Sequence, residues 1–448
     1  MAAPGKVGLS VSLITLLLLS VLLAACGEAT PTPARPTVTT PGNTTVVQPV
    51  TLRWSYWGSD AEVQVNKRIA AQFESLNPNI KIEHVFVPFE QYFDKVKNEW
   101  NGSKAPDIMF LSTIPNYAAS GILENLQPYL DRDKNNFDLN DFYPNLLNTF
   151  KYKGALYGLP RDNDTKVIYY NKRLFLDSGV PFPKQNWTWK DLREAALKLT
   201  KSDPGGNIMQ YGLAFELKTW WRLWVYQNGG ELFNEFSAPN PPSKLLLNSP
   251  EAAEAIQFWA DLINVDKVTP RASEMQTSDM LNNLFTKGKV AMVFGGHGKV
   301  KIFDEVQNLD WDIVGLPGQK KRVNNAGGAG YTISAFSPNK EAAWTFVRYL
   351  EGLQGQALYV GTGLIVAARR SVREDSLFLR RQNYNAQVFI DEAELGRVNP
   401  QYIGAPEVDK IMDDALAPVF EGKQKAADVL AQLPNQVEPV LKKAGSGP

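Results

Sequence analysis

The chain has 448 residues and carries 47 Lys and Arg against 47 Asp and Glu, which gives a formal net charge of zero. This balance excludes the basic field that attracts nucleic acid and provides no acidic tail. One cysteine and two distant histidines, His84 and His297, form no ligand-spaced motif. Zinc, disulfide and Ser-His-Asp chemistry therefore have poor support, and we expect no metal, no cofactor and no nucleic-acid partner.

The first residues have the layout of a secretory signal. An uncharged run rich in Leu, Val and Ile covers residues 7–25, follows Lys6 and ends in Leu23-Ala24-Ala25-Cys26, with the small residues that precede a cleavage site. This ending resembles the lipobox of bacterial lipoproteins, which implies that residues 1–25 are removed and that Cys26 becomes a lipid-bearing amino terminus. The alternative is an uncleaved membrane helix, since about 20 apolar residues span a bilayer.

A flexible tether is expected after the cysteine. Residues 26–49 are mostly Thr, Pro, Val and Gly with almost no large apolar side chain, so they cannot bury enough surface to offset chain entropy. Proline keeps such a segment extended. A folded body should begin near residue 50, and its roughly 400 residues suffice for two or three domains at about 150 residues each.

The body opens with alternating strand and helix signals. A two-residue apolar period at 52–56 predicts a strand, and Gly58-Ser59-Asp60 then caps a helix that Asn77-Pro78 ends. A second strand, a second helix and a short buried strand are expected at 80–86, 89–100 and 107–111. This order predicts a parallel sheet covered by helices, so the fold class is α/β.

The same pattern continues along the chain. Thr188-Trp-Lys-Asp191 is typical of a capping box that opens a helix through Leu199. Ser249-Pro250 places an N-cap and a first-turn proline before another apolar stripe, and Ser337-Pro338 does so again. Four further strands are expected, at 166–170, 290–294, 311–314 and 331–334.

A set of motifs runs in fixed order through nearly the whole body. They are Trp54-Ser-Tyr-Trp57-Gly58, Phe73-Glu-Ser-Leu-Asn-Pro-Asn-Ile-Lys81, Ala105-Pro-Asp-Ile-Met-Phe110, Leu156-Tyr-Gly-Leu-Pro-Arg-Asp162, Tyr170-Asn-Lys172, Trp187-Thr-Trp-Lys-Asp-Leu192, Gln227-Asn-Gly-Gly230, Asn248-Ser-Pro-Glu-Ala252, Gly288-Lys-Val-Ala-Met292, Gly327-Gly-Ala-Gly-Tyr331 and Leu416-Ala-Pro418. The order resembles that of the bacterial extracellular solute-binding proteins of family 1, the maltose-binding-like sugar receptors of ABC importers.

The resemblance implies a two-lobe periplasmic-binding-protein-like fold of type II, with the solute in the cleft between the lobes. Three crossings rich in Gly or Pro would join the lobes, near Leu159-Pro160, Gly327-Gly328 and 361–364. Lobe I would comprise 50–160 with 328–362, and lobe II 161–327 with 363–448.

The family role implies a monomeric receptor outside the cytoplasm, held at the membrane by its lipid, at the cell surface or in the periplasm. Such a receptor captures a mono- or oligosaccharide and delivers it to the permease subunits of an ABC transporter. It catalyses nothing.

Candidate ligand-binding residues of lobe I follow strand ends. Trp57 suits a platform for the apolar face of a sugar ring, or a core position, since tryptophan is usually well buried. Ser59 and Asp60 either cap the next helix or face the cleft. Ser112 and Thr113 offer hydroxyl groups after the third strand, where a turn would need no ligand.

The polar stretch Arg161-Asp-Asn-Asp164 follows the first crossing. The resemblance puts a sugar-binding carboxylate at this turn, where Asp164 matches best and Asp162 is second. A carboxylate accepts two hydroxyl hydrogens at once, which suits neighbouring hydroxyl groups of a sugar.

Three tryptophans precede the Gln227 turn. Helical spacing favours Trp224, one turn past the other two, as the core residue. Trp220 or Trp221 is then expected to face the cleft.

The remaining candidates come from later turns. Gly296 and His297 occupy the turn where sugar-binding relatives commonly read Gly-Pro-Trp, and the change suggests a different ligand shape or a hydrogen bond from the imidazole. The resemblance brings Gly328 and Tyr331 near the solute, although turn chemistry alone would explain the glycine. Arg369 is either a surface charge or a cleft donor, given the fixed geometry of its guanidinium.

Two alternative functions stay open. One is a secreted carbohydrate-active enzyme, but Asp162 and Asp164 are two residues apart on one segment and do not bracket a glycosidic bond from opposite sides. The other is a receptor for a non-sugar solute such as a glycerol phosphate ester or a peptide, which would need a basic or backbone-pairing pocket.

Overall fold

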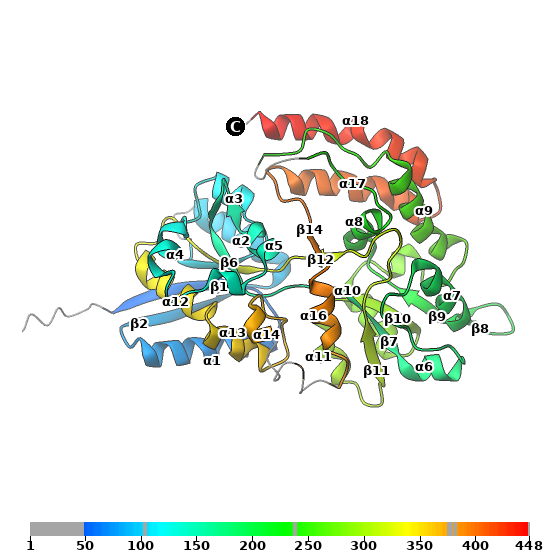
Figure 1. Cartoon of the computed structure of the whole chain (residues 1–448), viewed down its shortest axis with the longest axis horizontal. Helices are drawn as coiled ribbons and strands as arrows, with labels where there is room; N and C mark the ends of the chain where they lie inside the picture. The colour runs from blue at the N-terminus through cyan, green and yellow to red at the C-terminus, as the bar shows by residue number, and fades with distance from the viewer. Residues whose placement is uncertain (1–48, 102–104, 236–239, 374–378, 380–382, 447–448) are drawn as a thin grey trace, which may run out of the picture. The chain divides into compact units, whose positions relative to one another are not determined.

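The computed structural model describes residues 49–101, 105–235, 240–373, 379 and 383–446 (Figure 1). The expected signal segment, Cys26 and the tether lie outside these residues. The described body has two five-stranded sheets, each with its own apolar core, and we call the two halves lobe I and lobe II. None of the described helices combines the length and apolarity that crossing a membrane requires.

The lobe I sheet has the strand order β2-β1-β3-β13-β6. Its strands are β1 (Val50–Tyr56), β2 (Ile80–Phe86), β3 (Ile108–Leu111), β6 (Gly158–Pro160) and β13 (Gly330–Ile333). β1 runs parallel to β2 and β3, whereas β13 runs antiparallel to both β3 and β6. The expected parallel sheet is therefore mixed, because β13 enters from the other lobe and not through a helical crossover.

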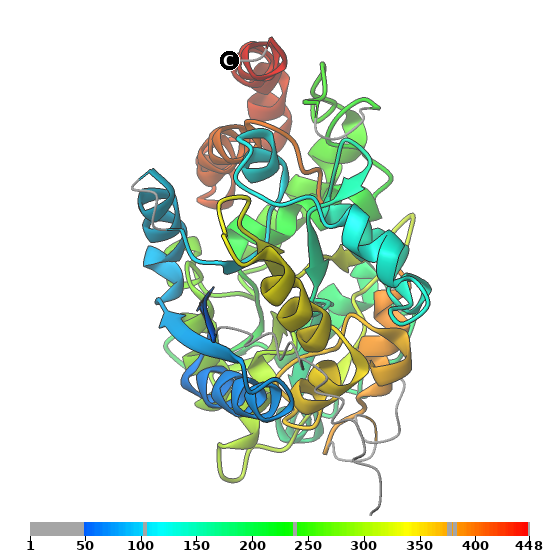
Figure 2. The same ribbon diagram turned by 90° about the vertical axis from the view of Figure 1, so that its left-hand side faces the viewer.

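The helices of lobe I begin largely where the sequence predicts. They are α1 (Asp60–Leu76), α2 (Phe89–Asn101), α3 (Pro115–Ala119), α4 (Gln127–Asp133), α5 (Pro144–Thr149), α12 (Lys340–Leu350) and α13 (Leu353–Val360), with a 3-10 turn at Leu139–Asp141. Figures 1 and 2 show α1 (blue) beside α13 (gold). A short hairpin, β4 (Lys151–Tyr152) and β5 (Ala155–Leu156), precedes β6.

One predicted helix start is wrong. α12 begins at Lys340 with Asn339 as N-cap, not at Ser337-Pro338. The Ser337 hydroxyl donates to the Asp107 carboxylate and accepts from the backbone N–H of Asn339. Ser337 thus stabilises a turn that comes before the helix, and the helix starts two residues later than predicted.

The lobe II sheet has the order β11-β7-β10-β9-β8. Its strands are β7 (Val167–Asn171), β8 (Lys201–Ser202), β9 (Ile208–Ala214), β10 (Val290–Gly295) and β11 (Trp311–Val314). β10 runs parallel to β9 and antiparallel to β7. This sheet is mixed as well.

The helices of lobe II confirm two predicted caps. Thr188 and Asp191 form the capping box of α7, and the Ser249 side chain caps α9 with Pro250 in its first turn. The longer helices are α7 (Trp189–Leu199), α8 (Leu217–Gln227), α9 (Pro250–Asn264), α10 (Ser278–Thr286), α17 (Ala405–Phe420) and α18 (Ala426–Gly445). The shorter ones are α6 (Lys172–Asp177), α11 (Lys299–Asp304), α14 (Arg370–Arg373) and α16 (Gln387–Ala393), with a 3-10 turn at Ala272–Glu274.

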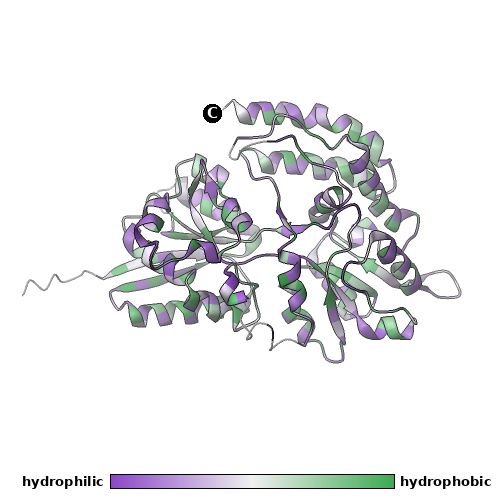
Figure 3. Ribbon diagram, viewed as in Figure 1, coloured by the Kyte–Doolittle hydropathy of each residue, from purple (hydrophilic) through white to green (hydrophobic). Residues whose placement is uncertain are grey.

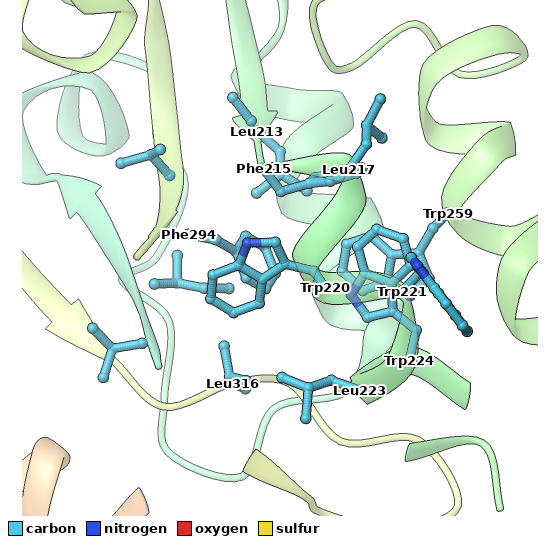
Figure 4. Packing of buried hydrophobic residues seen from close by; sticks show 14 of the residues in the cluster. Leu213, Phe215, Leu217, Trp220, Trp221, Leu223, Trp224, Trp259, Phe294 and Leu316 are labelled. Carbon is cyan, nitrogen blue, oxygen red and sulfur yellow. The ribbon is translucent and has the colours of Figure 1, made fainter. Parts of the chain in front are cut away.

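An aromatic cluster fills the centre of lobe II. The indole rings of Trp224 and Trp259 stack with centroids 4.2 Å apart, and Phe215 meets both edge-on (Figure 4). Along the surrounding helices hydrophilic and hydrophobic residues alternate (Figure 3), as expected of helices that bury one face. The assignment of Trp224 to the core is confirmed, because the residue is fully buried.

The chain passes between the two sheets in three segments that lie side by side. The segment after β6 bonds on one side to the segment before β13, through Arg161 N to Ala329 O at 2.9 Å. On its other side it bonds to the segment after α13, through Asn163 N to Val366 O at 2.9 Å and Ala368 N to Arg161 O at 3.2 Å. Backbone hydrogen bonds thus join the three crossings into one ribbon.

A short parallel pair, β12 (Asn324–Ala326) with β14 (Gly396–Val398), adjoins this ribbon. We call Gly396–Gln401 the strap. It reaches lobe I at two places, where Asn145 Nδ2 donates to Gly396 O at 3.1 Å and Thr113 Oγ1 donates to Gln401 Oε1 at 2.7 Å. The strap therefore connects the C-terminal part of the chain to lobe I beside the crossings.

We expect Trp224→Ala to lower the free energy of unfolding by about 3–5 kcal/mol, because the substitution removes a stacked ring and leaves a cavity in the core. Urea unfolding followed by circular dichroism measures this loss. The matched control is Leu176→Ala on α6, where the side chain is 66% exposed and the cost should be close to zero. Equal losses in both variants would contradict the assigned core.

Candidate functional site

A cavity of about 620 Å³ lies where the three crossings meet. Its walls come from the ends of β1 and β3, from α1, α2 and α5, from all three crossings and from the strap. The lining residues are Trp57, Glu62, Phe89, Ser112, Thr149, Arg161, Asp162, Asn163, Asp164, His297, Gly298, Asn325, Ala326, Gly327, Gly328, Ala329, Leu364, Ile365, Val366, Val398, Asn399 and Gln401. Both lobes thus contribute to one concave surface, which is where a ligand site is expected.

Trp57 forms an aromatic wall of this cavity. It lies just past β1, and its ring packs edge-on to Phe89 with centroids 4.9 Å apart and against Phe110 at 5.0 Å. The residue is partly exposed, unlike Trp54 on β1, which is fully buried. A supported and partly open indole can stack on the apolar face of a ligand.

A buried ion cluster holds the first crossing against α1. The Arg161 side chain is only 5% exposed and donates to Asp162 Oδ2 at 2.6 and 2.8 Å and to Glu62 Oε1 at 3.1 Å. Its guanidinium lies over the Phe110 ring, 4.2 Å from the centroid. Burial raises the pKa of the Asp162 carboxyl, against the stabilising charge of Arg161.

This cluster gives three of the candidate residues structural roles. Asp162 Oδ1 also accepts from Ala329 N at 3.1 Å, so its carboxylate is taken up by the ribbon. Ser59 and Glu62 form the capping box of α1, and Asp60 is the first residue of that helix. Ser59 and Asp60 do not line the cavity. This favours a role at the N-terminus of α1 over a role in ligand binding.

Asp164 lies at the cavity with a carboxylate that remains partly accessible. The oxygen Oδ2 pairs with the Lys166 ammonium, and the side chain keeps 45% of its surface exposed. Its backbone N–H donates to Gly327 O at 2.6 Å. Gly296 packs against it so closely that a Cβ there would lie 2.1 Å from Asp164 Oδ1, so a larger residue would displace the carboxylate.

His297 is a buried, neutral contact between lobe II and the third crossing. Only 4% of the residue is exposed. Its Nε2 lies 3.2 Å from the Tyr384 hydroxyl, and the ring also hydrogen-bonds to the backbone of Leu364. Burial lowers the pKa of His297 to about 4, although the Leu364 bond and Asp164 act in the opposite direction. The imidazole lines the cavity without a charge near neutral pH.

Four candidate residues are not among those that line the cavity. Trp220 packs on Phe294 with 3% exposed, and Trp221 donates from Nε1 to Asp413 Oδ1 at 2.8 Å. Tyr331 is fully buried, with its hydroxyl 2.9 Å from that of Tyr359. Arg369 donates to Asp141 at 2.8 Å. The polar groups of Trp221, Tyr331 and Arg369 thus have partners inside the protein.

The other candidates are at or next to the cavity. Ser112 and Gly328 line it. A Cβ on Gly328 would lie 2.2 Å from Asp162 O, so the close contact between the first two crossings requires a glycine. Thr113 lies beside the cavity, where its hydroxyl holds Gln401.

Sequence reasoning missed several lining residues. Arg161 and Asn163 belong to the polar stretch that drew attention to the two aspartates, so a signal for them was present. Phe89 lies in the first turn of a predicted helix, and nothing in the neighbouring sequence distinguishes it from a core residue. Asn399 and Gln401 lie in an irregular segment that carries no periodic signal.

The described residues contain no group of three or more His, Cys, Asp or Glu side chains that could hold a metal ion. Two α/β lobes joined by three crossings, with a cavity that all three crossings line, place a concave surface at the interface of two domains, where ligand sites commonly occur. The model of the bacterial extracellular solute-binding protein family matches residues 59–357, more than half of the chain. The chain belongs to this family, whose members are solute-binding proteins that act outside the cytoplasm.

Relatives and a solved structure are similar to most of the chain at low sequence identity. A binding protein of Brucella abortus is 25% identical over 389 residues, covering 84% of this chain and 90% of that protein. The galactooligosaccharide-binding protein of Bacillus subtilis is 22% identical over 434 residues, 96% of each. The structure is similar to an ABC substrate-binding protein of Listeria monocytogenes in complex with cycloalternan, with a TM-score of 0.78 and 23% identity over 88% of this chain and 100% of that one.

We expect His297 to make stability fall in mild acid. Between its ordinary pKa near 6.5 and the folded value of about 4, the unfolded chain binds a proton at this ring and the folded chain does not. The free energy of unfolding should therefore fall as the pH falls, by about 2 kcal/mol between pH 7 and pH 5 from this group. His297→Gln should remove that part of the pH dependence, as measured by urea unfolding at both pH values. An unchanged pH dependence in the variant would contradict the assignment.

Proposed function

We propose that this protein captures a neutral saccharide in the cavity at the crossings and delivers it to the permease of an ABC transporter. The observation that carries the proposal is the combination of a partly open indole with polar groups that bear no unpaired positive charge. Trp57 offers the ring, and Asp164 offers a carboxylate oxygen to hydroxyl hydrogens. The named ligands of the relatives, galactooligosaccharides and cycloalternan, are of this class.

The charges around the cavity disfavour an anionic ligand. Arg161 is engaged by two carboxylates, Lys166 is paired with Asp164, and His297 is neutral. A phosphate group would have to compete with these carboxylates for the cations, and it would meet a surplus of negative charge. A receptor for glycerol phosphate esters is therefore the weaker alternative.

The carboxylates also disfavour hydrolysis. Asp162 is bonded to Arg161 and to a backbone amide, and Glu62 caps α1 while it binds Arg161. Both carboxylates are therefore already engaged and cannot act as the general acid or the general base. Glycoside hydrolysis needs two such carboxyl groups on opposite sides of the glycosidic bond. We infer that the protein binds its ligand without altering it.

The mode of action follows from the crossings. A ligand that contacts both walls stabilises the closed arrangement of the lobes and shifts the population toward it. We propose that the receptor is a monomer, anchored outside the cytoplasm by lipid on Cys26, and that the permease recognises the closed form.

A thermal-shift screen tests the proposed ligand class. The probes are galactooligosaccharides, cycloalternan, maltotriose and common monosaccharides, with glycerol 3-phosphate as the anionic comparison. A specific probe at 100 times its dissociation constant should stabilise the folded state by about 2.7 kcal/mol. A shift with glycerol 3-phosphate alone, lost on adding salt, would favour the phosphate-ester receptor and refute the saccharide proposal.

We expect Trp57→Ala and Asp164→Asn each to weaken saccharide binding by about ten- to hundred-fold, because a stacked ring or a charge-assisted hydrogen bond is lost. Calorimetric titration with the best saccharide of the screen measures this, and melting curves should stay close to wild type. Asp177→Asn, an exposed aspartate on α6 that pairs with Arg173, is the matched control. Normal binding together with a sharply lower melting temperature in Asp164→Asn would assign that residue a structural role.

A further inference from the structure

Asn163 presents an unusual combination of burial and unmet hydrogen-bonding capacity. It is 1% exposed and lies on the first crossing, where its backbone N–H is fixed to Val366 O at 2.9 Å. In the part of the chain that the structure describes, neither the amide nitrogen Nδ2 nor the oxygen Oδ1 has a hydrogen-bond partner. Buried polar groups are nearly always paired, so this amide calls for an explanation.

The position of Asn163 suggests which kind of partner would satisfy its side-chain amide. The residue lines the cavity, and its crossing is held on both sides by the other two, so the backbone cannot turn the amide toward solvent. Leucine has nearly the same shape as asparagine and would satisfy burial better. A ligand that enters the cavity could supply the partners that this amide lacks.

Two other lining residues share this property. Trp57 Nε1 and Asn399 Oδ1 are buried and lack a hydrogen-bond partner among the described residues. The three groups come from separate elements, namely the end of β1, the first crossing and the strap. An indole N–H only donates, whereas an amide both donates and accepts. Together they match hydroxyl groups, which can take either role.

We propose that Asn163 and Asn399 are specificity-determining residues that bind ligand hydroxyl groups from two sides of the cavity. This inference rests on the proposed saccharide-binding function and assigns it residues beyond Trp57 and Asp164. Asn163 holds its amide unpaired until the ligand arrives, so the unliganded protein is less stable than it could be. The strap becomes part of the ligand site through Asn399.

The experiment compares Asn163→Leu with a control two residues away. Thr165→Val is the control, because the Thr165 hydroxyl is also buried and unpartnered but the residue does not line the cavity. Both variants remove an unpartnered polar group without changing shape much. Unliganded melting temperatures and calorimetric affinities are measured for wild type and both variants, with galactooligosaccharides or cycloalternan as probe, whichever shifts the wild type more.

We expect Asn163→Leu to melt at or above the wild-type temperature and to lose at least about tenfold in affinity. Thr165→Val should keep wild-type affinity. Asn399→Leu should also lose affinity, and Asn163→Ala replaces the leucine variant if that one fails to fold.

Three results would overturn the inference while leaving the saccharide proposal standing. One is binding within twofold of wild type in both Asn163→Leu and Asn399→Leu. Another is an equal loss of affinity in Thr165→Val, which would point to a general disturbance of the crossing. The third is a lower melting temperature in both Asn163→Leu and Asn163→Ala, which would show an internal partner for the amide. A wild type that binds none of the saccharides in the thermal-shift screen overturns the inference together with the function on which it rests.

Discussion

The hydrogen-bonded ribbon of three crossings is the constraint on which the site depends. The first crossing lies between the other two and bonds to both of them along its length. Its backbone is therefore held on both edges, which sets the points from which the side chains of Arg161, Asp162, Asn163 and Asp164 leave the ribbon. The cavity-lining residues of the first crossing thus belong to the same ribbon that connects the two sheets.

Pairing of charges gives the cavity its chemical character. Arg161 is neutralised by Asp162 and Glu62, and Lys166 by Asp164, so the walls are polar without offering a free cation. A buried pair of this kind costs desolvation energy. Besides the paired charges, among them the partly exposed carboxylate of Asp164, the cavity is lined by amides, hydroxyl groups and one indole.

The sequence predicted the elements of the body well where local signals decide them. Ser59, Thr188 and Ser249 cap helices as expected, because capping depends on a few adjacent residues. The helix start predicted at Ser337 was wrong, because Ser337 forms a turn with Asn339 and a hydrogen bond to the distant Asp107, and the helix begins only after that turn. The mixed sheets could not be predicted, since the insertion of β13 beside β3 depends on the path between the lobes.

The site was predicted less completely for the same reason. Trp57 and Asp164 lie next to turns and reach the cavity, whereas Trp220, Trp221, Tyr331 and Arg369 are withdrawn by partners far away in sequence. The strap gave no periodic signal at all. Residues whose role depends on a contact between lobes need the tertiary structure to be recognised.

The strap has a mechanical consequence. It is bonded to lobe I through Gln401 with Thr113 and through Gly396 with Asn145. Because β14 also pairs with β12 next to the crossings, a rotation of one lobe against the other would pull on these two hydrogen bonds. The strap therefore limits how far the lobes can part for as long as both bonds last.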